Sequence, residues 1–311
     1  MLDKVLETCY EMVDISKFVK IDEQKIKLVA EKLKDLEYSH WIIGGNSRIL
    51  KLPIEKQINF LLVFDSINYS FWGDPKWTVK LDSGVNEDGS FALLEKLLDY
   101  YDKNNNLDFT KVTYDEFKEI LKGNVEIPLL EERYNTIYEV SKIVNEKMNG
   151  NFYEYIKDVN VDTELFDIIV SNFKSFEDYR VTGAKKVYFY KLAQLLVSDI
   201  LHLRECKENV NVDTSHLVGC SDYKIPQILR GLGVIEFNER LAALVDNKKE
   251  IKENSIFEIE IRAATIVSID KIKQYLNGIR NSIEINDLLW ELSHDKDINL
   301  KPYHLTRTTN Y

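Results

Sequence analysis

Glycine and proline are scarce along this chain, and that scarcity constrains its fold more than any other feature. The 311 residues include 5 prolines and 12 glycines, the two residues that most strongly mark turns and breaks in regular structure. Most segments place apolar residues three and four positions apart, which is the spacing of one face of an α-helix. With 44% hydrophobic residues, the chain can bury a sizeable core. We therefore expect a mainly α, multi-helix globular fold.

One segment breaks the helical spacing. Apolar and polar side chains alternate in Trp77-Thr78-Val79-Lys80-Leu81-Asp82-Ser83-Gly84, and the chain then turns as far as Gly89. Because this alternation is typical of a half-buried strand, we expect a small β-hairpin near 77–90. Helices are expected elsewhere, at about 2–19, 23–36, 54–68, 90–103, 113–121, 129–148, 162–173, 187–206, 225–233, 236–245, 262–279 and 284–295.

Two polar stretches indicate where the chain divides. Residues 102–108 include three successive asparagines, and Gly150-Asn151 follows a long expected helix. Such segments are typical of exposed connections. We expect an N-terminal helical lobe at 1–150 and a C-terminal helical lobe at 151–311, or the two merged into one integrated domain. A ligand is expected between the lobes, where binding clefts are common.

Charge and composition argue against several classes of function. A net charge of −11 disfavours broad binding to nucleic acid, which depends on many Lys and Arg side chains. The N-terminus carries acidic residues and no basic start followed by an apolar run, so we expect a cytoplasmic protein that does not enter a membrane. The three cysteines and five histidines show no metal-ligand spacing. We expect neither a metal nor a cofactor.

Residues 219–230 contain the strongest candidate for chemistry. Asp222 precedes Pro226, which suits the first turn of a helix, and apolar residues recur at Ile225, Ile228 and Leu229. Asp222 should therefore lie just before the helix, with its side chain fixed in place but accessible to a ligand. Taken alone, this segment is explained better by a structural role for Asp222 as the N-cap of that helix.

A resemblance to a known family changes this balance. Five blocks carry it, in order: Asn68-Tyr69-Ser70-Phe71-Trp72, Ile127-Pro128-Leu129-Leu130-Glu131-Glu132-Arg133, Lys186-Val187-Tyr188-Phe189-Tyr190-Lys191-Leu192-Ala193-Gln194, Ser221-Asp222-Tyr223-Lys224-Ile225-Pro226-Gln227 and Glu258-Ile259-Glu260-Ile261-Arg262. From about Asn59 to its end the chain resembles the queuosine salvage family, the queuosine 5′-phosphate N-glycosylase/hydrolases. The resemblance implies a fold similar to helical DNA glycosylases, and hydrolysis of queuosine 5′-monophosphate to queuine and ribose 5-phosphate.

The implied reaction gives Asp222 a role. Breaking an N-glycosidic bond passes through an oxocarbenium-like ribose, which a fixed carboxylate stabilises. Asp222 is the candidate catalytic residue, as nucleophile, base or electrostatic support. The implied base carries a cationic secondary amine, which calls for a carboxylate partner. The matching region is Asn286-Asp287-Leu288-Leu289-Trp290-Glu291, where the family often has Asp-Tyr-Tyr-Leu-Trp-Asp. Asn286, Asp287 and Glu291 are therefore candidate substrate-binding residues, of which Glu291 keeps the family's charge.

The resemblance implies further contacts with the base. The family commonly has an aromatic residue where this chain has Cys220, so stacking should come from Tyr223, Trp72 or Phe176. A family histidine that touches the ligand is matched to His40. For Cys220 a buried structural role, and for His40 a structural one, is the alternative.

A 5′-phosphate needs cationic partners, and the candidates are Lys191, Lys224 and Arg262. Lys191 lies in an apolar helix and should pair with a phosphate or with Asp178, Asp199 or Glu260; Asp178 is kept as a candidate site residue. Alternation in 258–262 places both glutamates and Arg262 on one side, which favours a structural ion-pair network over a catalytic role.

Two other functions compete with hydrolysis. A non-catalytic carrier or sensor of 7-deazaguanine nucleosides is suggested by Cys220 and opposed by the presence of Asp222. A base-excision enzyme acting on DNA or RNA is disfavoured by the acidic balance of the chain. The expected partner is a small-molecule nucleotide, with no direct nucleic-acid or membrane contact.

Overall fold

Helices dominate the computed structural model, which describes residues 2–44, 47–160 and 164–311. The α-helices are α1 (Asp3–Asp14), α2 (Glu23–Lys34), α3 (Trp41–Gly44), α4 (Ser47–Leu50), α5 (Ile54–Ser66), α6 (Gly89–Asn104), α7 (Tyr114–Ile120), α8 (Leu130–Lys147), α9 (Phe152–Ile156), α10 (Leu165–Asn172), α11 (Lys191–Glu208), α12 (Lys224–Gly231), α13 (Glu239–Asp246), α14 (Ile256–Leu276) and α15 (Ser282–Leu292). The strands are β1 (Val19–Ile21), β2 (Thr78–Lys80), β3 (Asn86–Asp88), β4 (Tyr179–Thr182), β5 (Lys185–Tyr188) and β6 (Ile235–Phe237). The mainly α fold class is confirmed.

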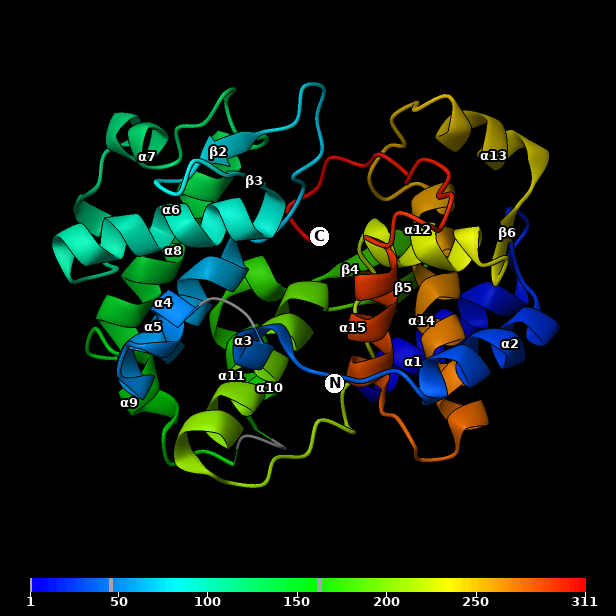
Figure 1. Cartoon of the computed structure of the whole chain (residues 1–311), viewed down its shortest axis with the longest axis horizontal. Helices are drawn as coiled ribbons and strands as arrows, with labels where there is room; N and C mark the ends of the chain where they lie inside the picture. The colour runs from blue at the N-terminus through cyan, green and yellow to red at the C-terminus, as the bar shows by residue number, and fades with distance from the viewer. Residues whose placement is uncertain (1, 45–46, 161–163) are drawn as a thin grey trace.

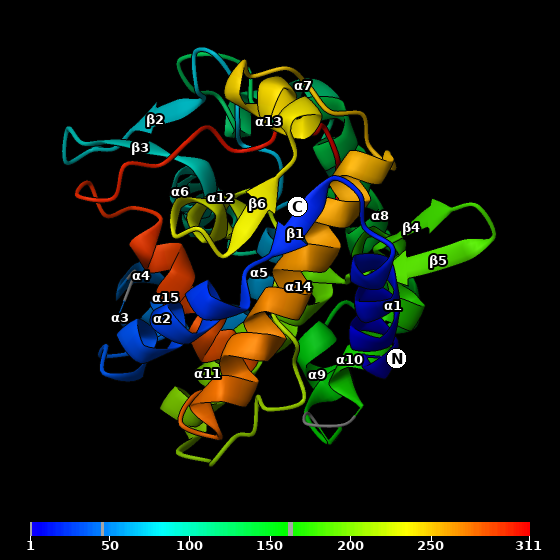
Figure 2. The same ribbon diagram turned by 90° about the vertical axis from the view of Figure 1, so that its right-hand side faces the viewer.

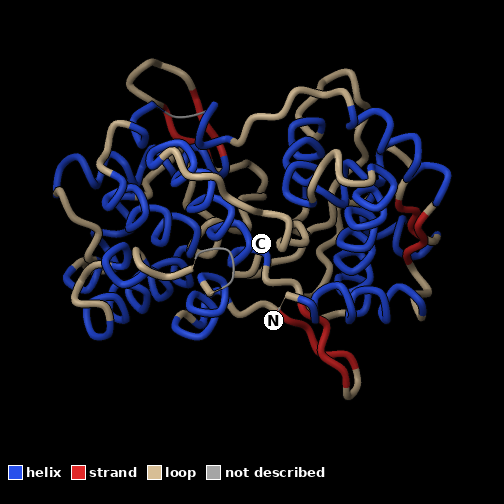
Figure 3. The backbone as a smooth tube through the Cα atoms, turned by 90° about the horizontal axis from the view of Figure 1, so that it is seen from below, coloured by secondary structure: helices blue, strands red, loops and turns tan. Residues whose placement is uncertain are grey.

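The strands form three separate antiparallel pairs, which Figure 3 shows at different places on the molecule. The pair β2–β3 is the hairpin expected near 77–90, with Val79 opposite Glu87. The pair β4–β5 was not expected, because the aromatic run at 187–190 reads as the start of α11. The pair β1–β6 joins segments more than 200 positions apart, a contact that no local pattern predicts.

Each expected helix has a counterpart, with two main departures. Helix α14 begins at Ile256 and not near 262, and the short helices α3, α4 and α9 were not expected. Positions 162–163 of the helix expected at 162–173 lie outside the described residues. Among the described residues, no helix combines the length and apolar character needed to cross a membrane.

The helices gather in two groups, visible at the left and right of Figure 1. One buried cluster spreads over α1 and α5–α11, and a second joins α2 with α12–α15. In Figure 2 the long helix α14 lies beside α1 and α2. The second cluster therefore takes members from both sides of residue 150, and a domain boundary at that position stays a prediction.

The last segment of the chain runs between the two groups (Figure 1, red). The carbonyl of Tyr311 accepts a hydrogen bond from the backbone N–H of Ser70 at 2.9 Å, and Thr306 accepts from the indole of Trp72 at 3.3 Å. The Tyr311 ring lies against the guanidinium of Arg262, 4.3 Å away. This segment thus ties the loop after α5 to α14, beside the start of α12.

Candidate active site

Asp222 lies at the start of α12, as the sequence predicts. Its Oδ1 accepts hydrogen bonds from the backbone N–H groups of Lys224 at 2.7 Å and Ile225 at 2.9 Å, so it caps the helix. The side chain is partly exposed. Within the described residues, no hydrogen bond to Oδ2 is found. The capping and functional interpretations are therefore compatible, because one oxygen fixes the carboxylate and the other remains available.

A buried ion pair holds the residue before Asp222. Arg262 is fully buried and donates from both Nη atoms to Asp178, at 2.8 and 2.7 Å. Its Nε donates to the carbonyl of Ser221 at 3.1 Å. Burial alone would raise the pKa of Asp178, but Arg262, Arg180 and the backbone N–H of Lys191 together lower it. This arrangement makes Arg262 and Asp178 a support for the Asp222 segment.

Cys220 lies at the centre of the remaining candidates. Its backbone N–H donates to the side-chain oxygen of Asn286 at 3.0 Å, and its thiol lies 3.6 Å from the carbonyl oxygen of Lys191. Burial raises the pKa of this thiol, and the charges of Asp287 and Asp222 raise it further. Cys220 is therefore a buried neutral thiol, surrounded by charged groups from α11, α12 and α15.

Helix α15 supplies two acidic groups one turn apart. Asp287 is partly buried and Glu291 is exposed, and each is close enough to affect this region electrostatically. Burial raises the pKa of Asp287, and the charge of Glu291 contributes in the same direction; burial also raises the pKa of Glu291. The Asn286 amide bridges two candidates: its oxygen accepts from the backbone N–H of Cys220, and its nitrogen donates to Oδ1 of Asp287 at 3.3 Å.

The rim beside Asp222 carries positive charge and aromatic rings. Lys224 has no carboxylate within ion-pair distance among the described residues, and burial followed by the charge of Lys76 lowers its pKa. Its ammonium lies 5.7 Å from the centre of the Tyr303 ring, and that ring lies 5.0 Å from Tyr223. His294 is near the same charges, which sequence reasoning did not single out.

Behind this rim lies a buried acidic pair that the sequence did not reveal. Asp65 and Asp199 are both fully buried, they lie close enough for the charge of Asp199 to act on Asp65, and the Oδ2 atom of each has no hydrogen-bond partner among the described residues. Burial raises the pKa of both carboxyl groups. Since two adjacent buried carboxylates repel each other, ionisation of one disfavours ionisation of the other. The sequence indicated Asp199 only as a possible partner for Lys191.

His40 belongs to this buried network. Its Nε2 lies 3.2 Å from Oδ1 of Asp199, and its Nδ1 accepts from the backbone N–H of Ile42 at 3.4 Å. Both ring nitrogens are thus engaged within the protein. The ring stacks on His202 with centroids 3.9 Å apart. Burial lowers the pKa of His40 to about 4, so the ring is neutral at physiological pH.

Lys191 and the two aromatic candidates occupy different surroundings. Lys191 is buried, and its ammonium donates to the carbonyl of Asn68 at 3.3 Å. Phe176 is fully buried and packs on Phe173 in the core. Trp72 is buried beneath the C-terminal segment, with Arg307 over its ring at 4.4 Å. Of the stacking candidates, Tyr223 is therefore the one beside Asp222, and contacts of all three with a ligand stay predictions.

The expected alternation in 258–262 was wrong, because this segment is the first turns of α14. Glu258 and Arg262 lie one helical turn apart, on one face, whereas Glu260 points elsewhere. Glu260 accepts from the backbone N–H groups of Phe18 at 2.6 Å and Val19 at 3.1 Å. It anchors the entry to β1 and is not a partner of Lys191.

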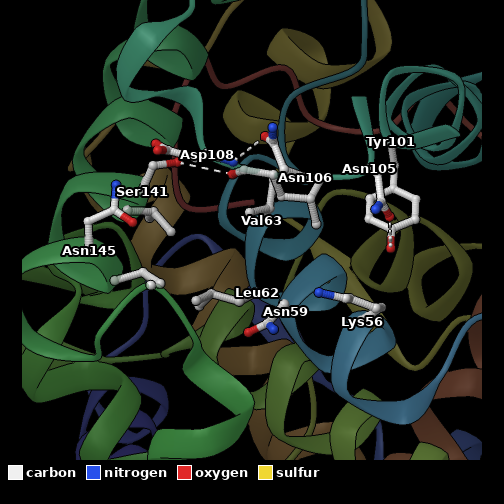
Figure 4. Close-up of a pocket in the computed structure, with 14 residues that line it drawn as sticks. Lys56, Asn59, Leu62, Val63, Tyr101, Asn105, Asn106, Asp108, Ser141 and Asn145 are labelled. Carbon is white, nitrogen blue, oxygen red and sulfur yellow. Dashed lines mark hydrogen bonds between the residues drawn. The ribbon is translucent and has the colours of Figure 1, made fainter. Parts of the chain in front are cut away.

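Asp222 lines neither of two cavities found elsewhere. One lies between α5, the end of α6 and α8 (Figure 4), and its lining includes Lys56, Asn59, Ser141 and Asn145. Ser141 there accepts from the N–H of Phe109 at 3.1 Å. The second lies between α1, β1 and α14. Neither cavity contains a candidate residue named from the sequence, and the site around Asp222 stays a prediction.

Comparisons with known proteins identify the family of this chain. The profile of a family described as "Queuosine salvage protein" matches residues 50–311. A Sphaerobacter thermophilus protein named "Queuosine 5′-phosphate N-glycosylase/hydrolase" is 30% identical, over 99% of this chain and 97% of its own length. Proteins of the same name from Dictyostelium discoideum and Bos taurus are 30% and 28% identical, over 83% of this chain and 79% and 82% of their lengths. The chain belongs to the queuosine salvage protein family.

Proposed function

We propose that this protein hydrolyses the N-glycosidic bond of queuosine 5′-monophosphate and releases queuine for reuse in tRNA modification. The names of its relatives describe an N-glycosylase/hydrolase acting on queuosine 5′-phosphate. The observation that carries the proposal is the carboxylate of Asp222. One of its oxygens is fixed by two backbone N–H groups, and the side chain is partly exposed. A reacting ribose needs such a fixed and reachable carboxylate.

Asp222 would act on the sugar. As the bond between the ribose and the base breaks, positive charge develops at the anomeric carbon and the ring oxygen. A carboxylate held in place stabilises that charge without having to reorganise, an effect worth about a hundredfold or more in rate. The same group can orient or deprotonate the attacking water. The hydrogen bonds from the backbone N–H groups of Lys224 and Ile225 fix the orientation of this carboxylate.

The groups around Asp222 match the two charged ends of this nucleotide. The secondary amine of queuosine is cationic at neutral pH, and Asp287 and Glu291 supply carboxyl groups on one face of α15. The phosphate is anionic, and Lys224 is the candidate cation that lies on the rim beside Asp222. Lys191 is buried against a backbone carbonyl, and Arg262 is already paired with Asp178. We therefore assign the phosphate to Lys224.

Release of free base tests the proposal. Purified protein without added metal is incubated with queuosine 5′-monophosphate, with the queuosine nucleoside and with GMP, and the released bases are quantified by chromatography. We expect queuine from the nucleotide, less from the nucleoside and no guanine from GMP. Binding of queuosine 5′-monophosphate without any release would favour the carrier or sensor, and release of guanine would contradict the substrate assignment.

A further inference from the structure

A short chain of polar groups joins α15 to the interior of α11. The hydroxyl of Tyr38 lies 3.1 Å from Oδ2 of Asp287 and 3.3 Å from Nε2 of His202. On the far side of the imidazole, Nδ1 of His202 lies 2.8 Å from the backbone carbonyl of Ser198. A carbonyl can only accept, so Nδ1 carries a hydrogen. Nε2 of a neutral His202 is therefore an acceptor.

Counting protons along this chain limits its states. The Tyr38 hydroxyl has one hydrogen but two neighbours that accept, the Asp287 carboxylate and Nε2 of His202. If Asp287 is ionised and His202 is neutral, the single Tyr38 hydrogen can reach only one of Oδ2 of Asp287 and Nε2 of His202, while Oδ1 of Asp287 accepts from the side-chain amide of Asn286 at 3.3 Å. All three groups are satisfied when Asp287 is protonated, donates to the Tyr38 oxygen, and Tyr38 donates to His202. A buried acceptor without a donor is costly, which favours this neutral state.

A second state with the same number of protons also satisfies every group. The Asp287 proton moves to the Tyr38 oxygen while the Tyr38 proton moves to Nε2 of His202. Asp287 is then a carboxylate that accepts from Tyr38, and His202 is an imidazolium that donates to Tyr38 and to Ser198. No proton enters or leaves the protein. The two states differ in the charge of Asp287.

The surroundings favour the neutral state when no cation is present. Asp287 lies near Glu291 of its own helix and near Asp199 of α11. Burial, with the charge of Glu291, raises the pKa of Asp287 against the opposing effects of His40 and of the hydrogen bonds from Asn286 and Tyr38. Burial, and then the neighbouring His40, lower the pKa of His202 to about 4. The other charged groups acting on this chain are Glu284, near Tyr38, and Glu205, near His202.

We propose that Tyr38 and His202 switch Asp287 between a neutral carboxyl and a carboxylate, so that the site accepts a cationic amine without exchanging a proton with solvent. The inference rests on the proposed function for the identity of that amine. The bound cation stabilises the carboxylate of Asp287, and the displaced proton is kept on His202. Asp287 binds the amine, whereas Tyr38 and His202 are positioning residues. Without the amine, this part of α15 thus avoids a cluster of ionised carboxylates.

Calorimetric titration with queuine measures the proton exchange directly. Binding enthalpies are recorded in buffers of different ionisation enthalpy, since their slope gives the number of protons released. For the unchanged protein we expect about zero protons, and for Tyr38→Phe and His202→Leu release of about one. We expect these variants to bind queuine about tenfold more weakly, the effect of losing a hydrogen bond to a charged group.

Two controls separate the switch from damage to the fold. Tyr10→Phe also removes a tyrosine hydroxyl that donates to an aspartate, Asp270, at 2.7 Å, but at the contact of α1 with α14. It should leave both proton release and affinity unchanged. The ligand 7-deazaguanine lacks the amine, and it should bind all four proteins with similar affinity and without proton release.

The outcomes are distinct. Release of one proton by the unchanged protein, or no increase in release in either positioning variant, overturns the switch even if queuosine 5′-monophosphate is hydrolysed. Loss of affinity for 7-deazaguanine in both variants would also overturn it, because their defect would then be structural. If the unchanged protein does not bind queuine and does not hydrolyse the nucleotide, the proposed function fails, and the switch fails with it.

Discussion

Removing the charge of Asp178 should destabilise the protein far more than removing the charge of a similar surface aspartate. Asp178 accepts from both Nη atoms of Arg262 and from the backbone N–H of Lys191, and both side chains of the pair are buried. Asp178→Asn keeps the shape but removes the carboxylate that lies between Arg262 and Arg180, and Arg262 is then left with Glu258 alone, at 4.0 Å. Breaking a buried pair in this way costs about 3–5 kcal/mol. Since Arg262 also holds Ser221, activity should fall as well.

The matched control lies on the surface. Asp246 pairs with Arg230 through two contacts, at 2.7 and 3.1 Å, but its side chain is 37% exposed. Asp246→Asn should cost about 0–1 kcal/mol, because solvent reaches the carboxylate even though the Arg230 side chain is only 7% exposed. Urea unfolding of the three proteins, followed by circular dichroism, gives the free energies of unfolding. Equal losses in the two variants, or a loss below about 1 kcal/mol for Asp178→Asn, would refute the argument from burial.

The same pair predicts how stability depends on pH. The pKa of Asp178 is lower in the folded protein than its ordinary value, so folding is favoured by the ionised form. The contribution is fully present above the unfolded pKa, about 3.9, and is lost as the pH falls through the lower folded value. The stability difference between the unchanged protein and Asp178→Asn should therefore shrink below about pH 4. A stability difference that grows on acidification would contradict the lowered pKa of Asp178.

Two further predictions concern the site. Lys224→Met should raise KM for queuosine 5′-monophosphate about tenfold through loss of a charge-assisted contact, and steady-state kinetics should show little change with the nucleoside; equal losses on both substrates would contradict the phosphate assignment. Iodoacetamide should modify the exposed Cys206 and spare the buried Cys9 and Cys220, because burial raises the pKa of both buried thiols. Peptide mass mapping locates the label, and rapid modification of Cys220 in the native protein would show that its pocket is open.

Local chemistry made the start of α12 predictable. Pro226 suits the first turn of a helix, and Asp222 suits the cap, so both the boundary and the orientation of the carboxylate follow from adjacent residues. The β2–β3 hairpin was predictable for the same reason, from alternation within 77–84. The prediction for 258–262 was wrong because five alternating residues are too few to tell a strand from a helix. Nearly every face of α14 is buried, so its sequence shows no clear helical period.

The buried network could not be predicted from local patterns. Asp65 and Asp199 meet because α5 packs on α11, and the stack of His40 on His202 joins positions more than 160 residues apart. The sequence contained one sign of this network, because Asp199 and His202 lie three positions apart on one face of an apolar helix. Such a pair of polar residues has many explanations. Long-range packing, which the sequence does not display, decides which explanation holds.

The most direct test of the central claim compares two aspartates that cap helices in the same way. Asp22 accepts from the N–H groups of Gln24 at 2.8 Å and Lys25 at 3.1 Å at the start of α2, as Asp222 does at the start of α12. Asparagine caps helices as well as aspartate, so Asp22→Asn and Asp222→Asn should both fold normally.

Single-turnover release of queuine from queuosine 5′-monophosphate is then measured for both variants, with binding followed by calorimetry. We predict that Asp222→Asn loses about a hundredfold or more in rate while still binding the nucleotide, and that Asp22→Asn releases queuine at the unchanged rate. Normal turnover by Asp222→Asn would show that Asp222 is a helix cap alone and that the catalytic carboxylate lies elsewhere.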